Sequence, residues 1–305
     1  MNDALSPDPT DLLAAWRERV QADLEQVNRC REVADPTDFY APVKDRFRMH
    51  PRRTDDETLN ALVALAEPRD VWLDVGAGGG RYALPLAMRV RQVLAIDPSP
   101  SMLGALREDA AAAGIGNIKL IEARWPMAHP PKGDVALAAH VGYDIAEIGP
   151  FVDQLEAQAS RLCVAVLGES AMQTVAALFW RRIHGEPRVR LPALPEFLVL
   201  LTARGRLPEV TLVDRTPPTF ASTEEAHAMA RRQLWLDEGS VKDRKLRRLV
   251  ERTLTERDGR YGFEWTPTRI GVVTWPPDGG STEARSASRD LHRTSRVCRR
   301  TCRRR

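Results

Sequence analysis

The 305-residue sequence predicts an α/β fold built on a doubly wound, mostly parallel sheet of seven strands. Between residues 71 and 275, short apolar runs alternate with stretches that have the periodicity of helices. The early runs are apolar throughout, which is typical of parallel strands that helices cover on both faces. The first run is followed at once by a glycine-rich turn at residues 76–80 and then by a helical stretch.

Residues 1–70 are expected to form an N-terminal helical cap or lid. Asp8 is a suitable N-cap and Pro9 suits the first helical position. The helix that follows is expected to bury one apolar face, which carries Leu12, Leu13, Trp16, Val20, Leu24 and Val27. Thr54 and Glu57 have the spacing of a capping box and predict the start of a second helix.

A single domain is expected at residues 71–276, with a ligand-binding core at 71–168. Its strands are predicted at 71–75, 93–96, 118–121, 135–139 and 162–167. Helices are predicted between the strands: one reaching about residue 88, one from Pro100 to about Gly114 with Ser99 as its N-cap, and one at 148–161.

The pattern loosens after residue 168. Helices are predicted at 171–182 and 197–203, and the last two strands at 210–213 and 269–275. The insertion at about 215–268 is expected to be helical, with one helix opened by a capping box at 222–225 and another at 241–256. Residues 277–305 are expected to be a disordered, arginine-rich tail.

The charge of the chain is unevenly distributed. Residues 279–305 hold nine arginines and two acids, a net charge of +7, so the remainder of this +3 chain carries −4. A basic body that tracks nucleic acid is therefore not predicted, and nucleic acid is an expected partner only if the tail acts as an anchor.

The cysteines and the hydropathy exclude further classes of protein. The four cysteines show neither a disulfide framework nor a zinc-binding spacing, so no metal site is expected. The first residues lack the features of a signal peptide, and no apolar run approaches the roughly 20 residues of a membrane span. A cytoplasmic protein without membrane contact is the expectation.

The chemistry is predicted to centre on Asp74, Gly76, Gly78 and Gly80, where the first strand ends. Glycines at such a turn let the backbone approach a ligand closely, and dinucleotide-binding folds use the same device. Arg81, however, stands where the dinucleotide pattern has its third glycine. The carboxylate of Asp74 would repel a pyrophosphate and attract an ammonium or a sulfonium, so the charge favours a cationic ligand.

The segment 74–80 resembles the glycine motif of class I S-adenosylmethionine-dependent methyltransferases, which have a Rossmann-like fold, and the chain is most similar to their small-molecule branch. The resemblance implies that the turn from Gly76 through Ala77 and Gly78 to Gly80 cradles the methionine part of S-adenosylmethionine, with Asp74 nearby. In smaller members the last two strands form a hairpin, so the long insertion leaves the topology there open.

Two later segments agree with the resemblance. Asp97 follows the second strand, and a carboxylate there can accept both ribose hydroxyls. Residues 97–103 resemble the family's D-x-S-x-x-M-L segment, which implies that Met102 lies against the adenine. The resemblance also implies that Glu122 accepts from the adenine amino group and that the amide of Ala123 donates to the adenine ring, although a solvated loop acid is the alternative for Glu122. In these two segments, contacts with the cofactor are expected from Pro98, Met102, Glu122, Ala123 and Arg124.

His140 follows the fourth strand, where ligands of open parallel sheets bind. It is a candidate cofactor contact and a candidate general base for a hydroxyl acceptor, or it fills space beside the cofactor. Tyr40 is a candidate lid residue over the substrate, or else an ordinary core aromatic. The cluster Arg181, Arg182, Arg188 and Arg190 either contacts an anionic acceptor or is simply solvated.

The predicted function is methyl transfer from S-adenosylmethionine, which leaves S-adenosylhomocysteine, to an unidentified and small acceptor by direct in-line displacement. The (Asn/Asp)-Pro-Pro-aromatic motif of amino-methylating members is absent after the fourth strand, and none of the cysteines is placed for cytosine-C5 chemistry. The alternatives are a catalytically silent S-adenosylmethionine-binding protein, an RNA or protein methyltransferase, and, last, an NAD(P)-dependent oxidoreductase. The oligomeric state is not predicted.

Overall fold

A computed structural model describes residues 7–34, 38–171, 174–215, 217–263 and 269–277. Its centre is a seven-stranded sheet in the order β3-β2-β1-β4-β5-β9-β6. The strands are β1 (Val71–Val75), β2 (Gln92–Asp97), β3 (Ile118–Glu122), β4 (Gly133–Ala139), β5 (Ala159–Gly168), β6 (Glu209–Asp214) and β9 (Arg269–Trp275). Only β9 runs against its neighbours, so the predicted mostly parallel, doubly wound α/β fold is confirmed.

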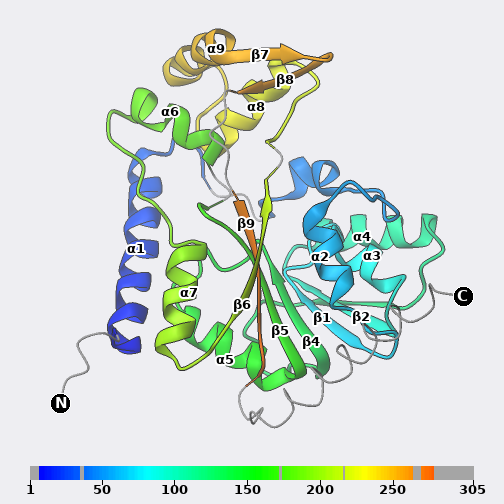
Figure 1. The fold of residues 1–305 in the computed structure, drawn as a ribbon. Helices are drawn as coiled ribbons and strands as arrows, with labels where there is room; N and C mark the ends of the chain where they lie inside the picture. Colours follow the sequence, from blue (N-terminus) through cyan, green and yellow to red (C-terminus); the bar gives the residue numbers. More distant parts are fainter. Residues whose placement is uncertain (1–6, 35–37, 172–173, 216, 264–268, 278–305) are drawn as a thin grey trace, which may run out of the picture.

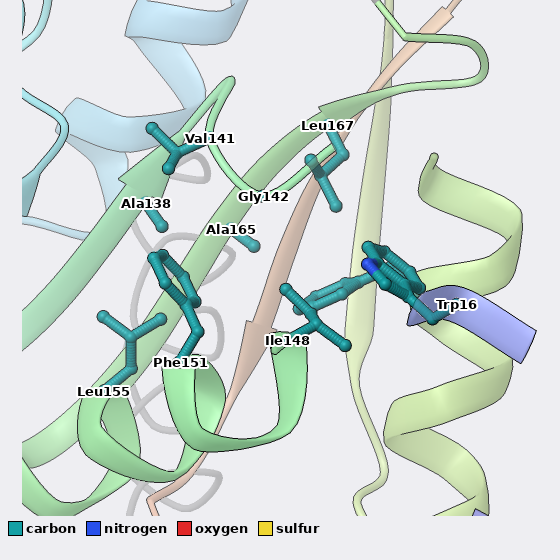
Figure 2. Close-up of a pocket in the computed structure, with 10 residues that line it drawn as sticks. Trp16, Ala138, Val141, Gly142, Ile148, Phe151, Leu155, Ala165 and Leu167 are labelled. Carbon is teal, nitrogen blue, oxygen red and sulfur yellow. The ribbon is translucent and has the colours of Figure 1, made fainter. Parts of the chain in front are cut away.

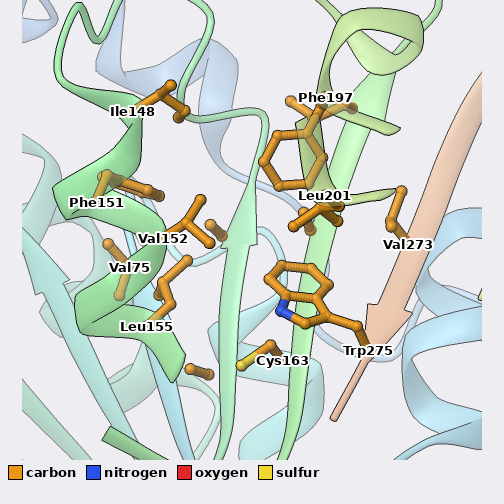
Figure 3. Packing of buried hydrophobic residues seen from close by; sticks show 14 of the residues in the cluster. Val75, Ile148, Phe151, Val152, Leu155, Cys163, Phe197, Leu201, Val273 and Trp275 are labelled. Carbon is orange, nitrogen blue, oxygen red and sulfur yellow. The ribbon is translucent and has the colours of Figure 1, made fainter. Parts of the chain in front are cut away.

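Helices cover both faces of the sheet (Figure 1). The helices α1 (Pro9–Cys30), α5 (Ile148–Gln158) and α7 (Leu194–Ala203) lie on one face, and α2 (Glu57–Ala64), α3 (Ala83–Ala87) and α4 (Pro100–Ala112) lie on the other. Each face of the sheet has its own apolar core, and Figure 3 shows the core on the face that α1, α5 and α7 cover. There Phe197 of α7 packs against Trp275 of β9 with a ring-centroid separation of 5.8 Å. Two separate apolar layers therefore hold the sheet.

A third apolar cluster lies at one end of the sheet, where Figure 1 shows α6 (Thr174–His184), α8 (Thr223–Gln233) and α9 (Val241–Thr253) together. The insertion is not wholly helical, which corrects the prediction, because β7 (Leu254–Arg257) and β8 (Arg260–Phe263) form a hairpin. Asp258 and Gly259 both have positive φ, 52° and 72°, as a two-residue hairpin turn requires. The helix predicted to reach residue 256 therefore ends at Thr253.

Strands β6 and β9 pair antiparallel even though the insertion separates them in the sequence. The last two strands of the sheet therefore pair with each other as in a hairpin, a point that the sequence had left open. Strand β9 lies between β5 and β6 because it pairs with both of them. Within the described residues, no helix combines the length and the apolar character that crossing a membrane would need. The predicted tail lies outside the described residues, apart from Pro277.

Two details of the N-terminal prediction are wrong. Leu24, which was expected on the buried face of α1, is 55% exposed. Asp23 and Gln26 are buried there instead, because they bond to the segment that follows α6. The N-cap of α2 is Asp56, whose carboxylate accepts from the amide of Leu59 at 3.0 Å, and Thr54 lies outside the helix. The predicted cap of Asp8 on α1 is confirmed, since its side chain accepts from the amide of Thr10.

Candidate active site

The carboxyl ends of β1, β2 and β4 lie side by side, because β1 pairs in parallel with both of the others. The glycine turn follows β1 directly. The amides of Gly76 and Ala77 both donate to the carbonyl of Ile96 at the end of β2, at 2.8 and 3.1 Å. The turn is therefore fixed against the strand that ends in Asp97.

The glycines of the turn serve different purposes. Gly76, Gly78 and Gly80 all have positive φ, which favours glycine. A Cβ on Gly76 would lie 2.3 Å from a methyl group of Val141, and one on Gly80 would lie 2.3 Å from Leu106. A Cβ on Gly78 would meet only the Met102 methyl group, at 3.7 Å. Gly76 and Gly80 are thus needed for packing, and Gly78 alone borders free space.

The carboxylate of Asp97 joins the turn to the next helix. One oxygen accepts from the amide of Gly78 and the other from the amide of Ser99, both at 2.8 Å. Burial raises the pKa of Asp97, while these two hydrogen bonds act in the opposite direction. Each carboxylate oxygen has a second lone pair, so Asp97 can still accept from a ligand.

Asp74 lies one strand away from Asp97 and is only 2% exposed. Burial, and then the charge of Asp97, raises its pKa to about 7. A site with two adjacent buried carboxyl groups gains from a positively charged ligand, which offsets their mutual repulsion.

A carboxylate that the sequence did not indicate also lies here. Asp38 accepts from the hydroxyl of Ser99 at 2.9 Å and from the amide of Ser101 at 3.2 Å. Its negative charge contributes to the raised pKa of Asp97, after burial. No periodic pattern marks Asp38, because it belongs to an irregular segment that reaches the site only in the fold.

The other predicted cofactor contacts are placed differently from one another. Met102 is buried beside Gly78, whereas Pro98, Glu122 and Arg124 are exposed. The amide of Ala123 donates to the carbonyl of Asp97 at 3.2 Å, so it is already used between neighbouring strands. The amide of Ala123 is therefore not free to donate to a ring, as the sequence prediction required.

His140 adopts an unusual backbone conformation for its residue type, with a φ of 58°. Its amide donates to the carbonyl of Val166, and its Nε2 lies 3.5 Å from the hydroxyl of Tyr82. Its Nδ1 is buried and has no hydrogen-bond partner among the described residues. Burial, and then the charges of Arg81 and Arg215, lowers the pKa of His140 to about 4, so the ring is neutral at neutral pH.

Tyr40 belongs to the lid segment, which we define as residues 38–48 and which includes the 3-10 helix η1 (Ala41–Phe47). Its ring packs edge-on against Phe39 and Phe47, at 5.3 and 5.6 Å between centroids, and the residue is 40% exposed. Burial, and then the charges of Asp144 and Asp97, raises the pKa of Tyr40, so its hydroxyl lies on the acidic side of the site.

The lid segment is held from two directions. Arg46 pairs with Glu225 of α8 at 2.5 Å, and Arg48 pairs with Asp109 of α4 at 2.6 Å. Arg232 of α8 donates to the carbonyl of Phe39. The lid therefore bridges the insertion and the core above the glycine turn.

A small apolar cavity lies beyond the end of β4, towards α1 and α5 (Figure 2). Its volume is about 10 Å³, close to what one water molecule needs. Val141, Ile148 and Leu167 are among the residues that line it. The cavity is too small for a methyl acceptor, and its lining offers no charged group.

Comparison with known proteins identifies the class of this site. Residues 73–155 match the protein family described as a methyltransferase domain, and this segment contains Asp74, the glycine turn, Asp97 and His140. Residues 73–155 thus carry a methyltransferase domain, and the sheet around them has the fold of class I, S-adenosylmethionine-dependent methyltransferases.

Individual proteins of known type match parts of this chain. A probable cobalt-precorrin-6B C(15)-methyltransferase (decarboxylating) of Methanothermobacter thermautotrophicus is 33% identical over 38% of this chain and 64% of its own length. A tRNA/tmRNA (uracil-C(5))-methyltransferase of Pseudomonas savastanoi pv. phaseolicola is 33% identical over 30% of this chain and 25% of its own. The chain thus spans less than two thirds of either relative.

The solved structure of the YcgJ protein from Bacillus subtilis has the same fold as this chain. The two structures superpose with a TM-score of 0.52 at 14% sequence identity. The superposition covers 73% of this chain and 99% of the other. The shared part therefore extends well beyond the segment that matches the methyltransferase family.

The residues at the glycine turn suit the cofactor of this class. S-adenosylmethionine carries a sulfonium and an ammonium, and the buried pair Asp74 and Asp97 provides negative charge for them. The space beside Gly78, bounded by Met102, is open to a ligand. Charge and space therefore both agree with S-adenosylmethionine as the cofactor.

Proposed function

We propose that this protein transfers the methyl group of S-adenosylmethionine to a small-molecule acceptor. The observation that carries the proposal is the acidic pair Asp74 and Asp97 against the glycine turn, beneath a lid that the chain itself closes. A nicotinamide dinucleotide would bring an anionic pyrophosphate towards the carboxylate of Asp74, which is electrostatically unfavourable.

Three side chains are proposed to hold the ribose and the adenine of the cofactor. Asp97 would accept the ribose hydroxyls with the lone pairs that Gly78 and Ser99 leave open. Met102 would contact the adenine, and the exposed Glu122 is the candidate acceptor for its amino group. When bound, the cofactor supplies an already activated methyl group, so the protein has mainly to align the reactants and exclude water.

The lid favours a small acceptor over a macromolecule. Its ion pairs to Glu225 and Asp109 close the site from the insertion side and the core side. An RNA or a folded protein would have to displace both contacts to reach the end of β4. A small molecule needs only local opening, which is common for enzymes that close over their substrates.

His140 is proposed to orient the acceptor rather than to remove a proton from it. A general base works best when its pKa lies near the working pH. The pKa of His140 is lowered to about 4, so its ring would be a weak base at neutral pH. Its buried Nδ1 has no hydrogen-bond partner among the described residues and can bond to a group of the acceptor.

Methylation of a pyrimidine carbon receives no support from the cysteines that the structure describes. This chemistry needs a nucleophile beside the transferred methyl group. Cys163 is fully buried in the middle of β5, and Cys30 at the end of α1 bonds to Glu186. Neither thiol lies at the glycine turn.

Radiolabelled methyl transfer tests the proposal. The purified protein is incubated with methyl-labelled S-adenosylmethionine and with cell extract separated into small molecules, RNA and protein. The expected result is label in a product made from the small-molecule fraction. Label only in RNA or protein would contradict the small-acceptor proposal, and binding without transfer to any fraction would indicate a catalytically silent protein.

A further inference from the structure

The two sides of the proposed site carry opposite charge. Asp38, Asp74 and Asp97 lie at the ends of β1 and β2, around the glycine turn. Around His140 the charges of Arg81 and Arg215 outweigh that of Asp56, since burial and then the two arginines lower the pKa of His140 while Asp56 raises it. A cationic cofactor suits the first side, and the second side calls for a different ligand.

Two of the arginines share one carboxylate. Arg53 and Arg81 each place a guanidinium nitrogen 3.0 Å from the same oxygen of Asp56. Their guanidinium carbons lie 5.9 and 5.4 Å from the centre of the Tyr82 ring, whose hydroxyl faces His140. The single negative charge of Asp56 is thus shared by the positive charges of Arg53 and Arg81, next to the ring of Tyr82.

Several nitrogen atoms in this group are buried without a hydrogen-bond partner among the described residues. They are Nη1 of Arg53, Nε of Arg81 and Nδ1 of His140. The side chain of Arg53 is only 9% exposed. Buried polar atoms are normally bonded, and buried charges are normally compensated, so these atoms indicate a ligand that supplies oxygen acceptors and negative charge.

Arg215 adds a further positive charge that acts on His140. It follows β6 and is half-buried, and it interacts electrostatically with Tyr143 and Arg81. The hydroxyl of Tyr143 accepts from the amide of Gly168 at 2.7 Å, which fixes this residue at the end of β5. Arg53 and Arg81 therefore meet at Tyr82, and Arg215 adds a third positive charge from a distant segment.

We propose that the methyl acceptor carries an oxyanion, either a carboxylate or a phosphate, which Arg53, Arg81 and Arg215 bind beside Tyr82 and His140. The inference rests on the proposed methyl transfer and names the class of its substrate. Guanidinium groups bind both kinds of oxyanion with paired hydrogen bonds.

The arginines that the sequence offered for an anionic acceptor do not form this group. Arg181, Arg182 and Arg190 are exposed, and Arg188 pairs with Asp23 at 2.6 Å. The three that gather at His140 could not be recognised from the sequence, because they are far apart in the chain.

Histidine NMR on the full-length protein, saturated with S-adenosylhomocysteine, tests the inference. The probes are sodium phosphate and sodium acetate, each compared with sodium chloride at equal ionic strength. The ring signal of His140 is assigned by its loss in His140→Gln. The expected result is a saturable shift of that signal with at least one oxyanion and none with chloride. The pKa of His140 is also expected to rise in the bound state, because the negative charge offsets Arg81 and Arg215.

Substitutions identify the binding residues. Arg81→Gln and Arg215→Gln are each expected to weaken the oxyanion response about tenfold, because each removes a charge-assisted hydrogen bond. Arg89→Gln, an exposed arginine after α3, is the matched control and should bind the oxyanion as the unaltered protein does. Calorimetry with S-adenosylhomocysteine should give the same affinity for all of these variants, which also shows that they are folded.

The outcomes separate the two proposals. A response to phosphate alone assigns a phosphate-bearing acceptor, and a response to acetate assigns a carboxylate. If S-adenosylhomocysteine binds but neither oxyanion shifts His140, or if the arginine variants respond normally, the oxyanion proposal is overturned. If S-adenosylhomocysteine itself does not bind, the proposed function fails and the inference fails with it.

Discussion

Asp97 is the residue on which the cofactor assignment depends most. Asp97→Asn removes the negative charge and one acceptor oxygen, while it keeps the shape of the side chain. We expect the affinity for S-adenosylhomocysteine to fall by about 1.5–3 kcal/mol, the scale of hydrogen bonds to charged groups. Calorimetric titration measures this loss. Glu251→Gln, an exposed residue on α9, is the control, and an unchanged affinity of Asp97→Asn would refute the assigned ribose site.

The raised pKa of Asp74 determines how cofactor binding and protein stability are expected to depend on pH. Its folded-state pKa of about 7 lies above the unfolded value of about 4, so its contribution to stability is full below about pH 4 and is lost as the pH rises through about 7. The cationic cofactor favours the ionised carboxylate, so the affinity for S-adenosylmethionine should rise by at most about tenfold per pH unit over the same window.

Titration calorimetry between pH 5 and about 8 checks this dependence. Asp74→Asn cannot ionise, and its affinity for S-adenosylmethionine should vary much less with pH over that window. A steep dependence that persists in Asp74→Asn would assign the titration to another group. Chemical denaturation of the ligand-free protein over the same pH range should show the opposite trend.

The sequence predicted which residues gather at the glycine turn, but not how each one is used in the fold. Asp74, the glycine turn and Asp97 are close in the chain, so local spacing was enough to place them together. The separate roles of Gly76 and Gly78 could not be predicted, because they depend on whether Val141 or open space faces each glycine. The use of the Ala123 amide by Asp97 likewise depends on the pairing of β2 with β3.

At the scale of elements, α9 attaches the insertion to the rest of the chain through Leu246. This side chain is fully buried in the third apolar cluster. Leu246→Ala is expected to lower the free energy of unfolding by about 2–5 kcal/mol, because the loss of buried methyl groups leaves a cavity. Urea denaturation measures the change. Val241→Ala in the same helix is the control, since Val241 is 74% exposed and should change stability by less than about 0.5 kcal/mol.

The contact between Arg232 and the lid segment is expected to affect how fast S-adenosylhomocysteine dissociates. The guanidinium of Arg232 lies 4.1 Å from the centre of the Phe39 ring and donates to the carbonyl of the same residue. Arg232→Leu should speed the dissociation of S-adenosylhomocysteine several-fold, because a cation–π contact alone contributes about 0.5–1 kcal/mol. Stopped-flow displacement measures the rate. Arg248→Leu on the exposed face of α9 should leave it unchanged, and equal rates for both variants would argue against a closing lid.

Elements with one strong local signal were predicted well, and those that depend on tertiary contacts were not. Strands β1 to β5 follow from apolar runs, and the caps at Asp8, Ser99 and Ser222 follow from side-chain chemistry. The hairpin β7–β8 was missed although Asp258 and Gly259 are a strong turn signal, because the helical periodicity of α9 was extended too far. The lid segment has no periodicity, since its shape is set by ion pairs to α4 and α8.

At the scale of the whole molecule, the fold could be predicted because strand and helix patterns alternate along the chain. The acceptor side of the site could not, because it unites residues 53, 81, 140 and 215 from segments that meet only in the folded protein. The family match also stops at residue 155, before β5, β6 and the insertion. Of the four acceptor-side residues, 81 and 140 lie inside the matched segment, whereas 53 and 215 lie outside it.

Calorimetric titration of the intact protein with S-adenosylmethionine, S-adenosylhomocysteine and NADH in parallel tests the central claim most directly. The buried carboxyl pair at the glycine turn leads us to expect micromolar binding of the first two ligands and no binding of NADH. Binding of NADH alone would contradict the assignment, because an anionic dinucleotide would then be accepted beside Asp74 and Asp97.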